Sequence, residues 1–293
     1  MRVDVGGARL YVDVDGAKLV PEGPRMRERP TVLLVHSGPG FDHHVFKAHL
    51  GPRLTAFAQV VYLDLRGHGR SDPASDEELR LDVWADDLHA VCDALGIERP
   101  VVLGHGFGAL VATRFLSRHP AAASALIAEA PYARVVPARM VEAFDRLGGP
   151  EAGEAARRFY DEPSHATLAE YLRTCYPHVL LSASAEELTR SVFTADTYVG
   201  WTVAEGLSFD LRDELGRIEV PTLVLAGEDD PYSPLTAVQE FADALPRGLV
   251  RFRSFPGARH GLFRDADPEA LDEVRAFLES LPPPGRSASA EPL

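Results

Sequence analysis

The chain has 293 residues, 45% of them hydrophobic, which is enough for one large α/β domain or for a domain with an inserted subdomain. Its formal net charge of −14 repels phosphate backbones and disfavours nucleic-acid binding. The N-terminus shows no basic segment leading into an apolar stretch, and no uncharged run approaches about 18 residues, so we expect neither a signal peptide nor a membrane span. The default expectation is a cytoplasmic protein. The two cysteines belong to no Cys/His spacing typical of a metal site.

Apolar runs in the first 130 residues predict a series of buried strands separated by glycine-rich turns and helices. The predicted strands are residues 8–15, 31–40 with its terminal Gly/Pro turn, 60–72 with its terminal glycine loop, 101–103 and 125–128. A helix is predicted over 83–95, where apolar residues recur at helical spacing and Gly96 is a plausible stop. A second helix is predicted over 109–117.

The pattern changes after residue 130. Residues 131–215 contain helical pieces with no convincing strand, and the strand pattern returns at 220–230 and again at 249–255. Ser233 followed by Pro234 predicts a helix N-cap with proline at the first helical position, and a last helix is expected from Asp267-Pro268. Alternation of strands and helices indicates an α/β fold with a mostly parallel sheet covered on both faces.

This pattern predicts a domain organisation in three parts. The core is residues 1–130 together with 216–281, and residues 131–215 form an inserted helical cap. The cap is expected above the carboxyl ends of the strands, where such sheets bind ligands. Residues 282–293 form a polar tail that we expect to be disordered.

Two glycine-rich segments that follow predicted strands fit roles in acyl transfer. The sequence HSGPG at residues 36–40 can aim a backbone N–H into a cleft. The sequence GHGFG at residues 104–108 has the form of a nucleophile elbow, G-x-S-x-G, except that Gly106 stands at the central position. The N–H of Phe107, just past this turn, would complete an oxyanion hole with the first segment.

Two further segments supply an acid and a base. The sequence GEDD at 227–230 ends a predicted strand, and a carboxylate there can orient an imidazole. His260 follows the last predicted strand in the sequence PGARHGLF. An exposed loop histidine is the alternative interpretation of His260 taken by itself, but the chain order of elbow, acid and histidine is that of α/β-hydrolases.

Together, HSGPGFDHHVF, YLDLRGHGRSD, VVLGHGFGALVA, VPTLVLAGEDDPYSP and FPGARHGLF resemble the α/β-hydrolase superfamily, and within it the proline-iminopeptidase-like branch. The resemblance covers about residues 30–130 and 218–280, whereas the insert matches only as a helical cap. It implies an α/β-hydrolase fold with no cofactor and no metal. The implied activity is that of an esterase or aminopeptidase acting on a small ester, lactone, amide or N-terminal prolyl substrate, with a small molecule or short peptide as the only partner.

The resemblance also assigns site residues by position. Gly106 stands where the nucleophilic serine belongs, Asp230 matches the acid, and His260 matches the general base. Gly38 and Phe107 match the oxyanion-hole amides, and Ser37 replaces the usual second residue of H-G-G-P-G. Asp229 is a poorer alternative for the acid. A further matching loop, read as structural, contains Asp64, Arg66, Gly67, Gly69 and Ser71.

Glycine at position 106 closes the ordinary acyl-enzyme route and leaves three interpretations open. The chain is an inactivated hydrolase, or it uses the His260–Asp230 dyad in another way, or it is a non-catalytic binding homologue. In the second case the dyad activates water or takes a proton from the substrate of a lyase or cyclase. Ser37 as a substitute hydroxyl is disfavoured by its loop.

A different class of protein also fits the turn. Gly104–Ala109 matches the G-x-G-x-x-A dinucleotide fingerprint, and Glu129 lies 25 residues after Gly104, near the place of a ribose-binding acid. A Rossmann protein that binds NAD is therefore the distant alternative. It leaves the segments HSGPG, GEDDPYSP and ARHG unexplained, and two strong strands precede the turn. Substrate recognition is expected from the cap, where acidic residues such as Glu205 either receive a substrate amine or form a solvated helix face.

Overall fold

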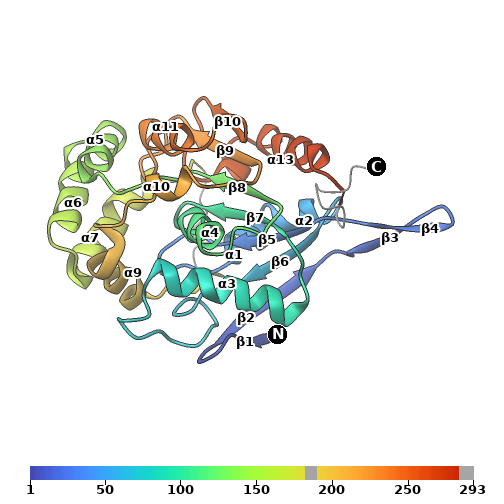
Figure 1. Cartoon of the computed structure of the whole chain (residues 1–293). Coiled ribbons are helices and arrows are strands. Elements are labelled where there is room, and N and C mark those ends of the chain that lie inside the picture. The colour runs from blue at the N-terminus through green and yellow to red at the C-terminus, as the bar shows by residue number, and fades with distance from the viewer. Residues whose placement is uncertain (182–189, 284–293) are drawn as a thin grey trace.

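The computed structural model describes residues 1–181 and 190–283 (Figure 1). The strands of its main sheet are β1 (Arg2–Asp4), β2 (Arg9–Asp15), β5 (Thr31–Val35), β6 (Gln59–Leu63), β7 (Val101–His105), β8 (Ala125–Glu129), β9 (Thr222–Gly227) and β10 (Val250–Phe255). They form one 8-stranded sheet in the order β1-β2-β6-β5-β7-β8-β9-β10. Strands β5 to β10 pair in parallel, and β1 and β2 add an antiparallel edge. The predicted mostly parallel sheet is confirmed.

Helices cover both faces of this sheet. One face carries α3 (Leu81–Leu95), α4 (Phe107–Arg118) and α11 (Leu235–Ala244), and the other carries α1 (His44–Ala48), α2 (Gly51–Leu54), α12 (Leu262–Asp265) and α13 (Glu269–Ser280). Successive side chains of a strand point to opposite faces. Leu33 therefore joins the core that contains Trp84, whereas its neighbour Val32 joins the core that contains Phe46. The predicted stop at Gly96 is confirmed by its left-handed backbone, with φ 60°.

In its described part, the segment between β8 and β9 is helical, as predicted. It contains α5 (Pro137–Gly148), α6 (Pro150–Asp161), α7 (His165–Cys175), a 3-10 turn (Tyr176–His178), α9 (Ala195–Trp201), a π-helical turn (Thr202–Gly206) and α10 (Arg212–Leu215). Figure 1 shows α5, α6, α7 and α9 gathered beside one end of the sheet. Their aromatic side chains, among them Phe144, Phe159 and Tyr171, form an apolar cluster of their own. The division of the chain into core and cap stays a prediction, and residues 284–293 of the predicted tail lie outside the described residues.

Two local features differ from the prediction. A hairpin of β3 (Leu19–Glu22) and β4 (Arg25–Glu28) extends away from the body of the molecule, and its sequence lacks a strand signal because nearly all its side chains are exposed (Figure 1). The predicted N-cap at Ser233 is wrong. Helix α11 begins at Leu235 after Pro234, because the Ser233 hydroxyl instead donates to the Ala130 carbonyl at 2.6 Å. Within residues 1–181 and 190–283, no helix has the length and apolarity needed to cross a membrane.

Candidate active site

The turn between β7 and α4 has the strained conformation expected of the elbow. Gly106 has φ 53° and ψ −112°, a region that L side chains rarely adopt. Its two flanking glycines are required by close backbone approach. A Cβ on Gly104 would lie 2.4 Å from the Gly108 carbonyl oxygen, and a Cβ on Gly108 would lie 2.1 Å from the Val35 carbonyl oxygen. Helix α4 therefore packs directly against the strands, with residue 106 at its tip.

Asp230 and His260 meet at the carboxyl ends of β9 and β10. The Asp230 Oδ2 atom lies 2.8 Å from His260 Nδ1, and the other oxygen accepts the backbone N–H groups of Tyr232 and Ser233 at 2.8 and 3.0 Å. The Asp230 side chain is fully buried. A carboxylate facing Nδ1 fixes the proton on that nitrogen and leaves Nε2 as an acceptor. Asp230, and not its neighbour Asp229, is the carboxylate bonded to the imidazole.

His260 stands directly against Gly106. A Cβ built on Gly106 would lie 3.0 Å from His260 Nε2 and 3.1 Å from Cε1. Such distances are shorter than most Cβ contacts in proteins, so a side chain at position 106 requires the imidazole to move back by a few tenths of an ångström. The chain thus brings Gly106, Asp230 and His260 together, and the imidazole edge faces the space that a side chain on residue 106 would enter.

The loop after β5 lies against the first residue of α4. A Cβ on Gly38 would lie 3.3 Å from the Phe107 ring. Because Phe107 is the first residue of α4, its backbone N–H has no partner inside the helix. His36 fixes this loop, because its Nδ1 lies 2.7 Å from the Ser37 carbonyl oxygen and its Nε2 accepts the Leu65 N–H at 3.1 Å. Burial lowers the pKa of His36, which keeps it in the neutral form that these two contacts need.

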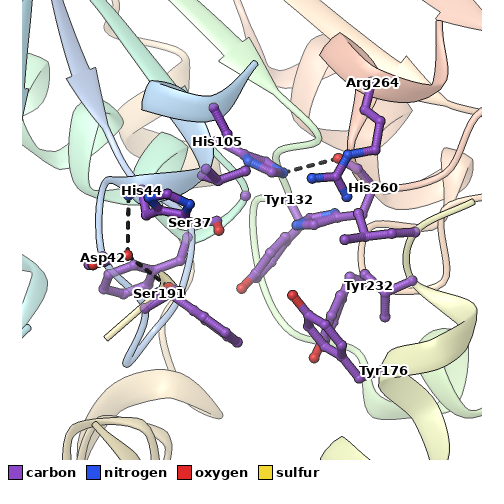
Figure 2. A pocket seen from close by; sticks show the side chains of 18 residues that line it. Ser37, Asp42, His44, His105, Tyr132, Tyr176, Ser191, Tyr232, His260 and Arg264 are labelled. Atoms are coloured by element: carbon purple, nitrogen blue, oxygen red, sulfur yellow. Dashed lines mark hydrogen bonds between the residues drawn. The ribbon is translucent and has the colours of Figure 1, made fainter. Parts of the chain in front are cut away.

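These groups surround a cavity of about 900 Å³ that includes open solvent (Figure 2). Gly38, Gly106, Phe107, His260 and Ser37 all line it. In Figure 2, Ser37, Asp42 and His44 lie on one side of the cavity and Tyr132, Tyr176 and Tyr232 on the other.

Asp42 ties the cavity wall to the helical segment. Its buried carboxylate accepts from the Ser191 hydroxyl at 2.7 Å and from the Val192 N–H at 3.1 Å, and it pairs with Arg70 at 2.8 Å. The neighbouring Gly40 carbonyl accepts the Thr194 N–H at 2.8 Å. Residues 191–194 are thereby attached to the loop that carries Gly38.

Two residues that the sequence analysis did not place in the site hold the His260 turn. The ring of His105, the last residue of β7, lies against that of His260, with centroids 4.5 Å apart and planes tilted by 37°. Its Nε2 lies 3.0 Å from the His260 carbonyl oxygen. Glu129, the last residue of β8, accepts the Leu262 N–H at 3.1 Å. Burial raises the pKa of Glu129 well above its usual value. The sequence signal that could have placed both residues in the site is their position at the ends of predicted strands.

Several polar side chains of the loop after β6 form bonds within the protein. Asp64 accepts from His43 and from the Arg70 backbone, and Arg66 forms two bonds with Asp87. A Cβ on Gly69 would lie 2.4 Å from an Asp64 oxygen. These contacts agree with the structural interpretation of this loop.

Glu205 makes a contact that differs from both predicted roles, which were binding of a substrate amine and exposure on a solvated helix face. Its Oε2 accepts the backbone N–H of Leu81 at 2.8 Å, at the N-terminus of α3. A carboxylate there interacts favourably with the unpaired amides and the helix dipole. Glu205 is not part of the lining of the cavity that His260 and Gly106 share, which argues against its expected role towards a substrate amine. Within the described ranges, no group of 3 or more His, Cys, Asp or Glu residues could hold a metal ion.

Comparisons with known proteins agree with this architecture. The model of one protein family, described as alpha/beta hydrolase fold, matches residues 30–267. The chain is 28% identical over 272 residues to the AB hydrolase superfamily protein YisY of Bacillus subtilis, a match that covers 86% of this chain and 92% of that protein. It is 25% identical over 276 residues to a proline iminopeptidase of Lactiplantibacillus plantarum, covering 87% and 94%. The solved structure of a proline iminopeptidase-related protein from Thermus thermophilus has a TM-score of 0.71 and 28% identity over 95% of each chain.

The dinucleotide-binding alternative is wrong. The Gly104–Ala109 turn follows β7, and β5 and β6 precede it in the same parallel sheet, so it is not the first strand–helix turn. Glu129 is buried and bonded to the Leu262 amide, which leaves it no access to a ribose. The matched family region also includes the segments that this alternative left unexplained.

Proposed function

Because the chain belongs to the family with the α/β-hydrolase fold, we propose that it hydrolyses a small carboxylic ester, lactone or amide without a serine nucleophile. In this proposal Gly106 occupies the nucleophile position, His260 is the general base and Asp230 orients it. Relatives named as a carbamate hydrolase, a proline iminopeptidase and an esterase support hydrolysis as the reaction class. N-terminal prolyl amides belong to the candidate substrates through these relatives.

One observation carries the proposal: the His260 ring is oriented by Asp230 and presents Nε2 at 3.0 Å from the Cβ position of residue 106. In a serine hydrolase the hydroxyl would extend from that position towards the base. Here glycine leaves Nε2 open to water from the cavity. A base with its tautomer fixed and its acceptor nitrogen uncovered can activate such a water directly.

The reaction then needs a single displacement. Water forms a bond to the substrate carbonyl carbon while its proton passes to His260 Nε2, and Asp230 stabilises the imidazolium that results. The oxygen of the tetrahedral intermediate accepts hydrogen bonds from the N–H groups of Gly38 and Phe107. The bond to the leaving group breaks, the leaving group takes the proton from Nε2, and a carboxylic acid and an alcohol or amine are released.

The proposal is tested by steady-state and rapid-mixing kinetics on p-nitrophenyl acetate, a γ-lactone and proline p-nitroanilide. The unaltered chain is expected to turn over at least one of them slowly and without a burst, since water and no acyl-enzyme is involved. His260→Ala is expected to lower kcat by about 10² or more, within the 10²–10⁴ typical of general-base catalysis. Asp230→Asn is expected to lower it as well, through loss of the fixed tautomer.

A surface variant, His165→Ala, is the matched control, because His165 is exposed, lies outside the cavity lining and pairs with Asp196. It should leave kcat unchanged. Turnover that persists in His260→Ala would contradict the assignment of His260 as the base. Binding of substrate analogues without turnover of any substrate would replace the hydrolytic proposal with the non-catalytic one. Slow exchange of a carbon-bound substrate proton that depends on His260, without hydrolysis, would favour a lyase.

A further inference from the structure

The hairpin of β3 and β4 stands apart from the rest of the molecule. Among the described strands, these two pair only with each other and form a separate sheet. Figure 1 shows the hairpin extending away from the body of the protein. A two-stranded hairpin by itself is at best marginally stable in water, because it has no core to pack on. The hairpin and its base, residues 18–29, are called the arm below, and the arm needs a surface to cover it.

The arm has one charged face and one apolar face. Residues paired across two antiparallel strands point to the same side, and so do alternate residues along one strand. Pro21 pairs with Met26, and Leu19 lies two residues before Pro21, so these three side chains share a face. Leu19 and Met26 are 54% and 58% exposed. The opposite face carries charged side chains, namely Glu22, Arg25 and Arg27. An antiparallel sheet with this pattern packs its apolar face against protein and leaves the other face in water.

The arm also differs in charge from the rest of the chain. It contains four basic and two acidic residues and therefore has a net charge of +2. The whole chain has a formal net charge of −14, which leaves −16 on the remainder. The arm is thus complementary in charge to the body of a second copy of this chain, whereas two arms repel each other.

The position of the arm leaves the candidate active site open. The arm joins the end of β2 to Thr31, the first residue of β5, and β5 is parallel to β6 and β7. It therefore leaves the sheet at the amino ends of the parallel strands. Gly106 and His260 lie beyond the carboxyl ends, at the opposite edge. A protein that covers the arm does not cover the cavity next to His260.

A reciprocal exchange of arms gives an interface of ordinary size. In a two-fold dimer the same contact occurs twice, so each copy contributes its arm and the surface that receives the other arm. Residues 18–29 are 12 residues, and a receiving surface of similar extent brings each side to about 24. Stable interfaces involve roughly 20–30 residues a side.

We propose that the arm is a dimerisation element, exchanged between two copies of this chain so that its apolar face packs on the acidic body of the partner. Leu19, Pro21 and Met26 supply the apolar area that is buried. The basic residues of the arm direct it to the acidic body. In the dimer the hairpin gains the packing that it lacks in the single copy.

Sedimentation velocity of the unaltered chain and of two variants tests the proposal. The double variant Leu19→Thr with Met26→Thr removes the apolar face but keeps the charge of the arm and the preference for strands. Val203→Thr is the matched control, because Val203 is 66% exposed and lies outside the arm, in the π-helical turn. A thermal melt of each variant verifies that the body stays folded, as expected for changes at exposed side chains.

The unaltered chain is expected to dimerise at concentrations up to about 100 μM, where a dimer with a micromolar Kd is almost complete. Its Kd should rise about 10-fold or more in the double variant and stay within 3-fold in Val203→Thr. It should also rise with added NaCl, because salt screens the attraction between arm and body. A monomer throughout this range, or a dimer that the double variant leaves unchanged, overturns the proposal. A monomer that binds anionic vesicles or DNA through the arm overturns it in favour of that other occupant.

A zero-length cross-link gives a second readout. A carbodiimide joins a lysine amine to a neighbouring carboxylate, and Lys18 and Lys47 are the only lysines in the chain. In a mixture of unlabelled and ¹⁵N-labelled protein, peptides joined at Lys18 should contain one light and one heavy partner. Lys18→Arg should lose these peptides and still sediment as a dimer. Links from Lys18 that stay within one chain, as to Glu28 at 3.2 Å, contradict the exchange of arms.

Discussion

The strand-end loops and the helical segment between β8 and β9 build the site in different ways. In the strand-end loops, backbone contacts and buried polar bonds fix each group, as with Gly104 against Gly108 and Asp230 against His260. In the helical segment, aromatic rings from separate helices pack on one another, as Phe159 does on Tyr171 with centroids 4.9 Å apart. In the proposed function, the first region supplies the reacting groups and the second contributes to the wall of the substrate cavity.

Gly106→Ser is the change with the largest expected effect on the strand-end region. If the remaining groups are those of a serine hydrolase, serine should raise kcat on p-nitrophenyl acetate by about 10² or more and introduce a burst. For comparison, loss of the nucleophile lowers kcat of a serine protease by roughly 10⁶. A fluorophosphonate should then label residue 106. The double variant Gly106→Ser with His260→Ala should show neither effect.

The same change is expected to lower stability, because φ 53° disfavours a side chain and the His260 ring must move. A loss of about 1–3 kcal/mol in the free energy of unfolding is typical of such backbone strain. Gly248→Ser is the control, because a Cβ at that position has nothing within 4 Å and no positive φ is found there. A silent and fully stable Gly106→Ser protein would show that the elbow has lost its function.

Asp87→Ala tests how firmly the loop after β6 is held. Asp87 and Arg66 form a two-bond ion pair with side-chain exposures of 4% and 7%. Removing the carboxylate leaves the buried Arg66 guanidinium with Glu78 as its remaining side-chain partner among the described residues, so urea unfolding should show a loss of about 3–5 kcal/mol. The adjacent Asp86 pairs with Arg118 on the surface, and Asp86→Ala should cost at most about 1 kcal/mol. Equal costs would contradict this description of the loop.

Glu129→Gln has the smallest expected effect, which is confined to the pH dependence of stability. Burial raises the Glu129 pKa well above 4.5, so the folded chain keeps a proton that the unfolded chain releases. The stabilisation is complete below the unfolded pKa and is lost as pH rises towards the folded pKa, by up to about 1.4 kcal/mol per pH unit. Urea titrations at several pH values give the slope of the free energy of unfolding against pH, and Glu129→Gln should reduce that slope. The exposed Glu142→Gln should leave the slope unchanged.

Sequence reasoning reached the strand-end region because its signals are local. Apolar runs predict the strands of the sheet, and glycines at 104, 106 and 108 predict the elbow. The order of Asp230 and His260 after this elbow is read directly from the sequence. Local rules failed where a tertiary contact competes with them. Ser233 has the pattern of an N-cap, but its hydroxyl reaches Ala130, which lies 103 residues away in the chain.

A second cavity, which shares Gly38, Tyr132 and Tyr232 with the first, was beyond sequence reasoning for a related reason. Tyr132 and Trp201 line it together, yet one follows β8 and the other ends α9, and no period in the sequence links them. The lack of charge in this cavity is also a property of the assembled lining. Acidic residues are present nearby in the chain, as at Glu205, but their side chains bond elsewhere.

The most direct test of the central claim is the intact mass of the unaltered chain after rapid acid quenching during turnover of p-nitrophenyl acetate. Hydrolysis by water activated at His260 predicts only the unmodified mass, while Gly106→Ser under the same conditions gains one acetyl group at residue 106. An acetyl adduct on the unaltered chain that forms and disappears at the rate of turnover, for example on Ser37, would contradict the account.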